Sequence, residues 1–245
     1  MRVALALIAM LSVPTLASAE TSVAALQRMA PDADARVLAL ALEARDCASR
    51  QPGQTASPRL AVIDYSLAST VPRLWVFDLQ RNKLLFREVV AHGQGTGENM
   101  ARAFSNRDGS HQSSLGLFRT TETYQGGNGY SLRMQGLEPG TNDAAMSRAI
   151  VMHGAPYVNV SNARKQGRLG RSWGCPAVRP EVAQAVIDSL KNGQMIFAYY
   201  PDSNWLARSP FLGCKQRALA AAAKAQARPS ASVAAGAGMM AALPE

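Results

Sequence analysis

The sequence predicts one β-rich domain with a few helices, and three observations support this fold class. The stretch 20–214, which lies between two atypical ends, has the usual length of a single domain with one core. Runs of aliphatic, β-branched and aromatic residues recur from about residue 60 to 200, separated by Gly, Asn and Pro. Strand-like and helix-like runs do not alternate regularly, which disfavours a doubly wound parallel sheet.

Two helices are expected. The sequence Pro31-Asp32-Ala33-Asp34 is typical of a helix start, and apolar residues at helical spacing follow it, so a helix is expected over about residues 32–47. The second helix begins at Pro180, which suits the first helical turn, and runs to about Lys191 before Asn192-Gly193.

The strands are expected between these helices and after the second one. Residues 73–79 and 84–93 flank the turn sequence QRNK and predict a hairpin. Gly and Asn are frequent between residues 93 and 140, where loops should separate short strands. The other strand-like runs are LAVIDYS (60–66), LGLFRTTETY (115–124), YSLRMQGLE (130–138), RAIVMHG (148–154) and QMIFAYY (194–200).

The two ends differ from the rest of the chain. Residues 1–19 have one early charge, an apolar run and the small-residue pattern Ala-Ser-Ala, as in a signal peptide cleaved before Glu20. A membrane anchor would need a longer apolar run. We therefore expect an exported protein, in the periplasm or cell envelope, without stable membrane insertion. Residues 215–245 are rich in Ala and predict a disordered tail, although 217–227 could form a lone helix that Arg-Pro-Ser ends.

The charge indicates a preference for anionic partners. The formal net charge is +9 and the sequence pI is about 9.9. No zinc pattern, RNA-binding signature or dense Lys/Arg block is present, and an exported chain seldom meets nucleic acid, so nucleic acid is excluded as a partner. An anionic envelope polymer fits the charge, and plain solubility explains it equally well.

The three cysteines, Cys47, Cys175 and Cys214, cannot all be paired with one another. Cys47 and Cys214 lie near opposite ends of the predicted domain, so a disulfide between them would join the termini. Cys175 is then free. The alternatives are that all three are reduced, or that Cys175 is a small buried apolar residue. No CxxC occurs, which argues against a zinc clip or a thioredoxin-like site.

A histidine near Cys175 would make it a nucleophile, because an imidazole can take the thiol proton at neutral pH. His92 and His153 both follow aliphatic strand-like runs and both precede Gly, whereas His111 lies in the polar segment SNRDGSHQSS. His153 leads His92 only modestly, since its strand adjoins the cysteine segment in the sequence. His92 and His111 could line the cleft or serve structural roles.

The segment GRSWGCPAV has the features of a catalytic turn. Gly174 permits a tight turn before Cys175, and the amides of both residues could point at a developing oxyanion. Gly154, directly after His153, would leave room for substrate. The alternative is a Gly-Cys-Pro turn packed for its shape, with Trp173 as a core anchor.

These motifs, in this order, resemble one family. The segments FSNRDGSHQSSLGLF, YSLRMQGLEPGTNDAAMSRAIVMHGAPYV and GRSWGCPAV are similar to the YkuD-like L,D-transpeptidases, in their branch of murein L,D-transpeptidase catalytic domain proteins. The resemblance covers roughly residues 60–200. It implies a β-sandwich-like fold, a nucleophile at Cys175 and a base at His153, and so it selects His153 over His92.

The sequence departs from the better-known branch of that family. The usual SHGC motif is Ser172-Trp173-Gly174-Cys175 here, and the Arg that commonly follows the cysteine is displaced. Arg171 and Arg179 are the candidates for holding a substrate carboxylate. Ser172, Trp173 and Gly154 complete the expected substrate-binding set, and the glycines at 126, 127 and 129 predict a loop beside the site.

The resemblance implies acyl transfer on peptidoglycan stem peptides through a Cys175 thioester, with no metal and no cofactor. A monomer is expected. Two alternatives stay open: an L,D-carboxypeptidase or endopeptidase that uses the same two residues, and a non-catalytic wall-binding protein. Sortases and papain-like or NlpC-type peptidases are disfavoured, because their motifs or the order of Cys and His differ.

Overall fold

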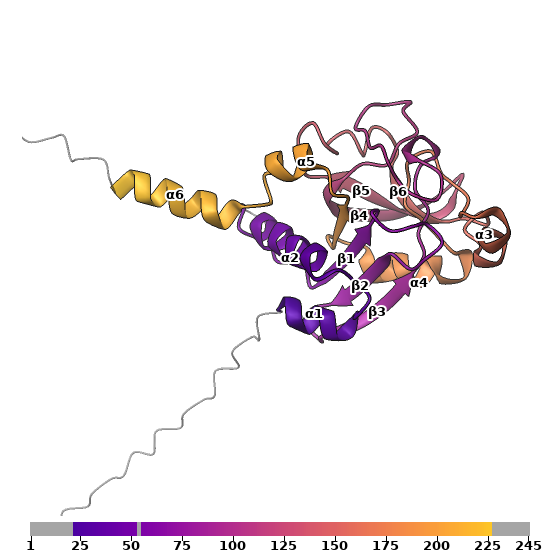
Figure 1. Ribbon diagram of the computed structural model, residues 1–245, viewed down its shortest axis with the longest axis horizontal. Helices are drawn as coiled ribbons and strands as arrows, with labels where there is room; N and C mark the ends of the chain where they lie inside the picture. The colour runs from indigo at the N-terminus through magenta and orange to yellow at the C-terminus, as the bar shows by residue number, and fades with distance from the viewer. Residues whose placement is uncertain (1–21, 53–54, 227–245) are drawn as a thin grey trace, which may run out of the picture.

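A computed structural model describes residues 22–52 and 55–226 (Figure 1). The described chain forms one eight-stranded sheet with helices packed around it, so the predicted mainly β fold with a few helices is confirmed. The strands are β1 (Arg59–Asp64), β2 (Leu74–Asp78), β3 (Lys83–Glu88), β4 (Gly116–Gly126), β5 (Gly129–Gly136), β6 (Val151–Gly154), β7 (Ala177–Val178) and β8 (Met195–Tyr199).

The sheet is mixed, in the order β3-β2-β1-β8-β4-β5-β6-β7. The pairs β1–β8 and β6–β7 are parallel, and the other neighbours are antiparallel. The predicted hairpin is present as β2 and β3, although its second strand was predicted over 84–93 and ends at Glu88. Strands β4 and β5 form a second hairpin, with a tight turn between Gly126 and Gly129.

The two edges of the sheet meet beside Cys175. After β3, at one edge, the chain crosses to β7, at the other edge, where the Ala91 N–H donates to the Ala177 carbonyl at 2.8 Å. Two residues later Gly93 forms a parallel bridge with Ser172. The segment after β3 thus fixes the cysteine loop from one side.

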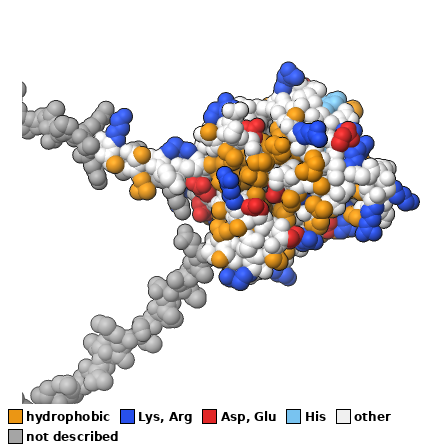
Figure 2. All heavy atoms as spheres, in the orientation of Figure 1, with side chains coloured by type: hydrophobic (Ala, Val, Ile, Leu, Met, Phe, Trp, Pro, Cys, Tyr) orange, Lys and Arg blue, Asp and Glu red, His pale blue; other side chains and the backbone are white. Residues whose placement is uncertain are grey.

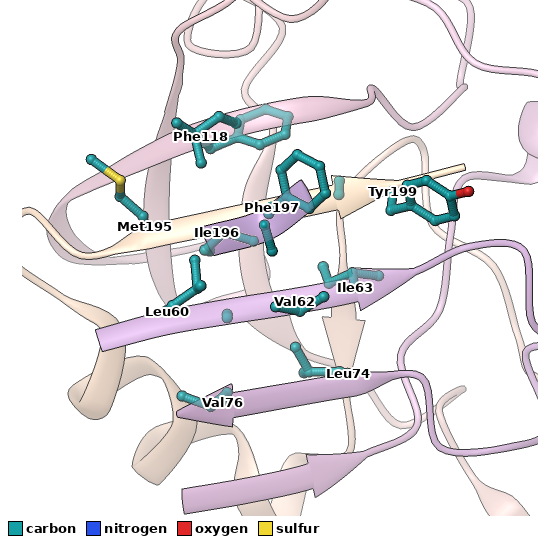
Figure 3. Close-up of a cluster of buried hydrophobic side chains, with 14 of the residues drawn as sticks. Leu60, Val62, Ile63, Leu74, Val76, Phe118, Met195, Ile196, Phe197 and Tyr199 are labelled. Atoms are coloured by element: carbon teal, nitrogen blue, oxygen red, sulfur yellow. The ribbon is translucent and has the colours of Figure 1, made fainter. Parts of the chain in front are cut away.

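The core lies around the centre of the sheet. Every residue of β2 and β8 is buried, as in strands covered on both faces, and the buried side chains of β1, β2, β4 and β8 pack together (Figure 3). Helix α2 packs against β1 and β8, and helix α4 packs against β1, β5 and β6. Through its contact with β6, α4 supports the strand that carries His153.

The helices are α1 (Val23–Met29), α2 (Ala35–Ser49), α3 (Val160–Gln166), α4 (Pro180–Leu190), α5 (Ser203–Arg208) and α6 (Cys214–Gln226), with a 3₁₀ turn η1 at Gln94–Thr96. The two predicted helices correspond to α2 and α4. Asp34 caps α2 by accepting hydrogen bonds from two amides of its first turn. In α4 the residues Ala183, Val186, Ile187 and Leu190 form the buried stripe that the spacing predicts.

Helices α1, α3 and α5 were not expected from the sequence. Each has only six or seven residues, which is too short for a clear apolar period. Their starts do carry a signal, because Ser22, Asn159 and Asp202 each cap the following helix with a side-chain oxygen. Their position depends on packing that the local sequence does not encode.

The described part of the tail agrees with the lone helix that the Ala run allowed over 217–227, and disorder directly after Cys214 is not found there. Residues 214–226 form α6, which projects away from the domain in Figure 1. The Ala run favours a helix. A disulfide joins Cys214, in the first turn of α6, to Cys47 of α2, so the predicted pairing of these two cysteines is confirmed. The Arg217 side chain also donates to the Pro210 carbonyl at 2.7 Å. The predicted signal peptide and residues 227–245 lie outside the described residues.

Within residues 22–52 and 55–226, no helix combines the length and apolar character needed to cross a membrane. Lys and Arg side chains are scattered over the face shown in Figure 2 and do not gather into one block. This spread fits the absence of a dense basic run in the sequence.

Candidate active site

Cys175 provides a free, buried thiol. Its Sγ accepts a hydrogen bond from the Val151 N–H at 3.4 Å, and its S–H group donates to the Ala149 carbonyl at 3.7 Å. Burial raises the pKa of the Cys175 thiol, while the Val151 N–H and then the positive charge of Arg148 oppose this rise. The group is therefore a thiol at neutral pH and needs a base to act as a nucleophile.

His153 provides an imidazole at the end of β6. Its Nδ1 lies 3.0 Å from the Gly154 carbonyl, which can only accept, so Nδ1 carries the proton and Nε2 is the basic nitrogen. Burial lowers the pKa of His153, and the Gly154 carbonyl partly opposes this. Among the described residues, Nε2 has no hydrogen-bond partner, so it is available to a substrate or thiol proton.

The parallel pairing of β6 with β7 brings the two groups together. His153 lies opposite Ala177, two residues after Cys175, and the His153 N–H points at the Pro176 carbonyl at 3.4 Å. Cys175 and His153 both line a cavity of about 290 Å³. No hydrogen bond joins the thiol to the imidazole within the described part of the chain. The structure therefore brings the predicted nucleophile and base into one cavity, with the thiol bound to the main chain.

The turn before Cys175 leaves one amide free. The Gly174 N–H, a predicted oxyanion donor, is already bound to Ser172 Oγ at 3.1 Å. The Gly174 carbonyl accepts from Ser113 Oγ at 3.0 Å. All peptide bonds of the described chain are trans, so the Cys175 N–H points away from Ser113, and it donates to no acceptor there. Cys175 is thus the better candidate for the oxyanion donor, and Gly174 serves the turn.

Gly174 is required by the shape of this turn. Its φ is 122°, a conformation that residues with a side chain rarely adopt, and a Cβ would lie 2.8 Å from the Gln112 carbonyl oxygen. Ser172 closes the turn on the other side, because its Oγ donates to the Cys175 carbonyl at 2.6 Å. Ser172 was predicted to bind substrate. It lines the cavity, but its hydroxyl is engaged in holding the nucleophile.

The two predicted carboxylate-binding arginines are both paired with glutamates. Arg171 lines the cavity, but its guanidinium donates to Glu98 at 2.7 Å and to the Gly97 carbonyl at 3.0 Å. Arg179 donates twice to Glu88, at 2.8 and 2.9 Å, and lines a separate cavity. The structure therefore does not bring Arg179 to Cys175, because the bidentate ion pair holds it at the start of α4.

Gly154 makes room for a helix. A Cβ there would lie 2.7 Å from the Cβ of Ala183 in α4, so glycine is needed for close packing of β6 on that helix. The prediction that Gly154 opens space for substrate is not supported by this geometry. Its carbonyl still contributes to the site by orienting the His153 ring.

Trp173 is not a core anchor. Its side chain is 71% exposed, lines the same cavity as Cys175, and stacks on His111 with ring centroids 4.9 Å apart and an angle of 8°. His111 therefore contacts a residue that lines the cavity but does not line the cavity itself. His92 is buried elsewhere and does not line the cavity.

Two cavity residues had not been singled out from the sequence. Asn128 lies in the turn between β4 and β5, whose glycines predicted a loop beside the site. Tyr157 lies in the turn after β6 and carried no local signal. In residues 22–52 and 55–226 no cluster of His, Cys, Asp and Glu is arranged to hold a metal ion.

A free cysteine and an imidazole whose Nε2 is unbound among the described residues line one cavity, and together they define a candidate cysteine acyl-transfer site on a mixed β-sheet. The family model described as the L,D-transpeptidase catalytic domain (YkuD_2) matches residues 29–199, which is most of the chain. The chain belongs to the L,D-transpeptidase catalytic domain family. Among curated proteins, none matches it significantly.

Several solved structures are similar to this one. An L,D-transpeptidase from Mycobacterium smegmatis is 15% identical, with 60% of this chain and 61% of that chain covered and a TM-score of 0.37. The helical cell shape determining protein Pgp2 from Campylobacter jejuni is 10% identical, with 67% and 56% covered and a TM-score of 0.42. An L,D-transpeptidase from Stackebrandtia nassauensis is 11% identical, with 72% and 75% covered and a TM-score of 0.34. The chain thus spans about three fifths of the length of the first of these structures.

Proposed function

We propose that this protein is an exported peptidoglycan L,D-transpeptidase of the cell envelope, which acts as a monomer and needs no cofactor. The observation that carries the proposal is that one cavity holds the free Cys175 thiol and the His153 Nε2, which has no partner in the described part of this family member. The substrate class, peptidoglycan stem peptides, follows from the family.

In this proposal Cys175 and His153 are both uncharged before substrate binds. Burial raises the pKa of Cys175 and lowers that of His153, so both effects oppose a thiolate–imidazolium pair in the free protein. Proton transfer then accompanies the attack of sulfur on the substrate. His153 acts as a general base, and its ring orientation is fixed in advance by the Gly154 carbonyl.

The reaction takes place in two acyl transfers. Sγ of Cys175 attacks the amide carbonyl after the diamino acid of the donor stem, and His153 Nε2 takes the thiol proton. The Cys175 N–H, which donates to no acceptor among residues 22–52 and 55–226, stabilises the oxyanion. The C–N bond breaks, the leaving amine takes the proton from His153, and a thioester remains.

An acceptor amine then attacks the thioester. Its proton passes to His153 and from there to the leaving sulfur, which restores the thiol. Water in place of the amine would give a hydrolase with the same residues. We propose that an amine, and not water, is the acceptor. The two reactions give different products and can be told apart by them.

The test uses the mature protein, starting at Glu20, with purified disaccharide-tetrapeptides and product analysis by mass spectrometry. Cross-linked dimers or exchanged terminal residues are expected with the wild type and not with Cys175→Ala or His153→Ala. A thioester adduct on Cys175 should appear in the intact mass of the protein. Shortened stems without cross-links would indicate hydrolysis, and full activity of Cys175→Ala would refute the proposed nucleophile.

A further inference from the structure

Trp173 is an exposed aromatic side chain without a role in the core. It is 71% exposed, whereas Trp75 and Trp205 are at most 5% exposed. The hydrophobic effect stabilises the folded state only through apolar surface that is removed from water, so the exposed part of this side chain does not stabilise the fold. An exposed aromatic group at the edge of a cavity is a common feature of binding sites.

The Trp173 ring is positioned by a stacked neighbour. Its inner face stacks on His111 at an angle of 8°. The His111 ring is in turn fixed by Gln94, whose side-chain amide donates to Nδ1 at 2.9 Å, and the His111 carbonyl accepts from the Gly95 N–H at 3.0 Å. One face of the indole is therefore covered by the imidazole, and the other is left for a ligand. We call this stacked pair, Trp173 and His111, the aromatic platform.

The loop that carries His111 is rigidly attached to the domain. The Arg148 guanidinium donates to the carbonyls of Ser105 and Gln112, both at 2.7 Å, and to the hydroxyls of Ser110 and Ser114. One cation thus holds the loop on both sides of His111. A surface fixed in this way binds without a further ordering cost.

The aromatic platform adjoins the reaction centre. Trp173 is two residues from Cys175, so their Cα atoms are at most about 7.6 Å apart. Trp173 and Tyr157, which is 38% exposed, line the cavity together with polar groups of Asn128 and Arg171. The mouth of the cavity therefore offers flat aromatic surface beside hydrogen-bonding groups.

We infer that the aromatic platform binds a pyranose ring of the glycan strand to which the donor stem peptide is attached. The inference rests on the proposed function and deepens it by assigning a subsite for the sugar. A pyranose has a flat face of C–H groups that stacks on an indole, and hydroxyl or acetamido groups that suit the polar neighbours. A stem peptide offers mainly charged and amide groups instead.

The length of the stem is compatible with this placement. Three extended residues span at most roughly 10 Å, so a sugar at the head of the stem remains near the bond that Cys175 attacks. The sugar can therefore occupy the aromatic platform while the third stem residue occupies the cavity.

The test compares two donors, a disaccharide-tetrapeptide and the same tetrapeptide without sugars. The wild type should show a higher kcat/KM for the disaccharide donor, through a lower KM. In Trp173→Ala the ratio of kcat/KM between the two donors should fall about tenfold, and Trp173→Phe should recover part of it. Leu219→Ala, which alters a side chain of α6 that is 72% exposed, is the matched control and should leave the ratio unchanged.

A second measurement does not depend on catalysis. Binding of an N-acetylglucosamine oligosaccharide to Cys175→Ala is followed by the NMR signal of the Trp173 indole N–H, assigned by comparison with Trp173→Phe. A shift of that signal on titration supports the subsite even if neither donor is turned over, in which case only the proposed function fails. An unchanged donor ratio in Trp173→Ala, an equal loss for both donors, or no shift of the indole signal would overturn the inference.

Discussion

Two segments of this protein, one four residues beyond the end of β3 at His92 and one in β6, carry nearly the same sequence in different surroundings. The segment Val89–Gly93 reads VVAHG, and Ile150–Gly154 reads IVMHG. Both histidines are buried, at 1% exposure for His92 and 4% for His153. Only the second lines the cavity with Cys175. The comparison shows that contacts between distant parts of the chain, and not the local sequence, decide which imidazole reaches the cavity.

The two rings have opposite tautomers. An arginine can only donate, so the contact of 2.7 Å between the Arg73 guanidinium and His92 Nδ1 makes that nitrogen an acceptor. The proton of His92 is then on Nε2, which lies 3.3 Å from the Gly97 carbonyl. Both nitrogens of His92 are occupied. In His153 the proton is on Nδ1, and Nε2 is free among the described residues.

The largest expected effect separates the two histidines by activity. His153→Gln should lower kcat/KM by roughly a thousandfold, because it removes the general base. Its free energy of unfolding should change by about 1 kcal/mol or less, since only one hydrogen bond to the main chain is at stake. Steady-state kinetics of cross-linking and urea unfolding measure the two quantities.

The matched variant is His92→Phe, which keeps a flat ring of similar size. Per folded molecule, its kcat/KM should stay within roughly tenfold of the wild type, because His92 holds the cysteine loop through its main-chain carbonyl, which accepts from the Ser172 N–H at 3.0 Å. Equal losses of activity in both variants would contradict the division of tasks.

The contrast also shows what the sequence could predict. Periodicity and turn residues identified the long helices and the hairpin, because those signals are local. The odd number of cysteines pointed to Cys175 as the free thiol, and the structure confirms the Cys47–Cys214 disulfide. The choice between His92 and His153 required the family resemblance, since the two sequence segments look alike.

The remaining features depend on contacts between distant parts of the chain. Glu88 is 91 residues from Arg179, and Glu98 is 73 residues from Arg171, so the pairing of both arginines could not be inferred from spacing. The same holds for Ser113, whose hydroxyl reaches the Gly174 carbonyl 61 residues away. No local sequence pattern distinguishes an arginine that is free to bind substrate from one that pairs with a glutamate far away in the sequence.

The second prediction concerns the stability of the His92 region. Arg73 is fully buried, and its guanidinium is bound to the carbonyls of Leu67 and Val90 as well as to His92. His92→Phe removes one acceptor from a buried cation and should lower the free energy of unfolding by about 3 kcal/mol. Urea unfolding at pH 8 provides the measurement.

A double variant tests the physical reason. Arg73→Met together with His92→Phe should cost less than the sum of the two single variants, because neither partner is then left unsatisfied. Strict additivity would show that the Arg73–His92 contact does not account for the loss.

The smallest expected effect is the contribution of His92 to the pH dependence of stability, which His92→Phe lacks. Burial, and secondly the charge of Arg73, lower the pKa of His92 from 6.5 to about 4. Between these values the unfolded chain binds a proton that the folded chain does not, so stability falls as the pH falls from 6.5 towards 4. The loss of unfolding free energy at pH 5 relative to pH 8 should be about 2 kcal/mol. Only the roughly 1.5 pH units below 6.5 contribute, at about 1.4 kcal/mol each. The difference in unfolding free energy between wild type and His92→Phe should therefore narrow by that amount from pH 8 to pH 5. A constant difference across this range would mean that His92 is protonated in the folded state, and that its tautomer is not fixed by Arg73.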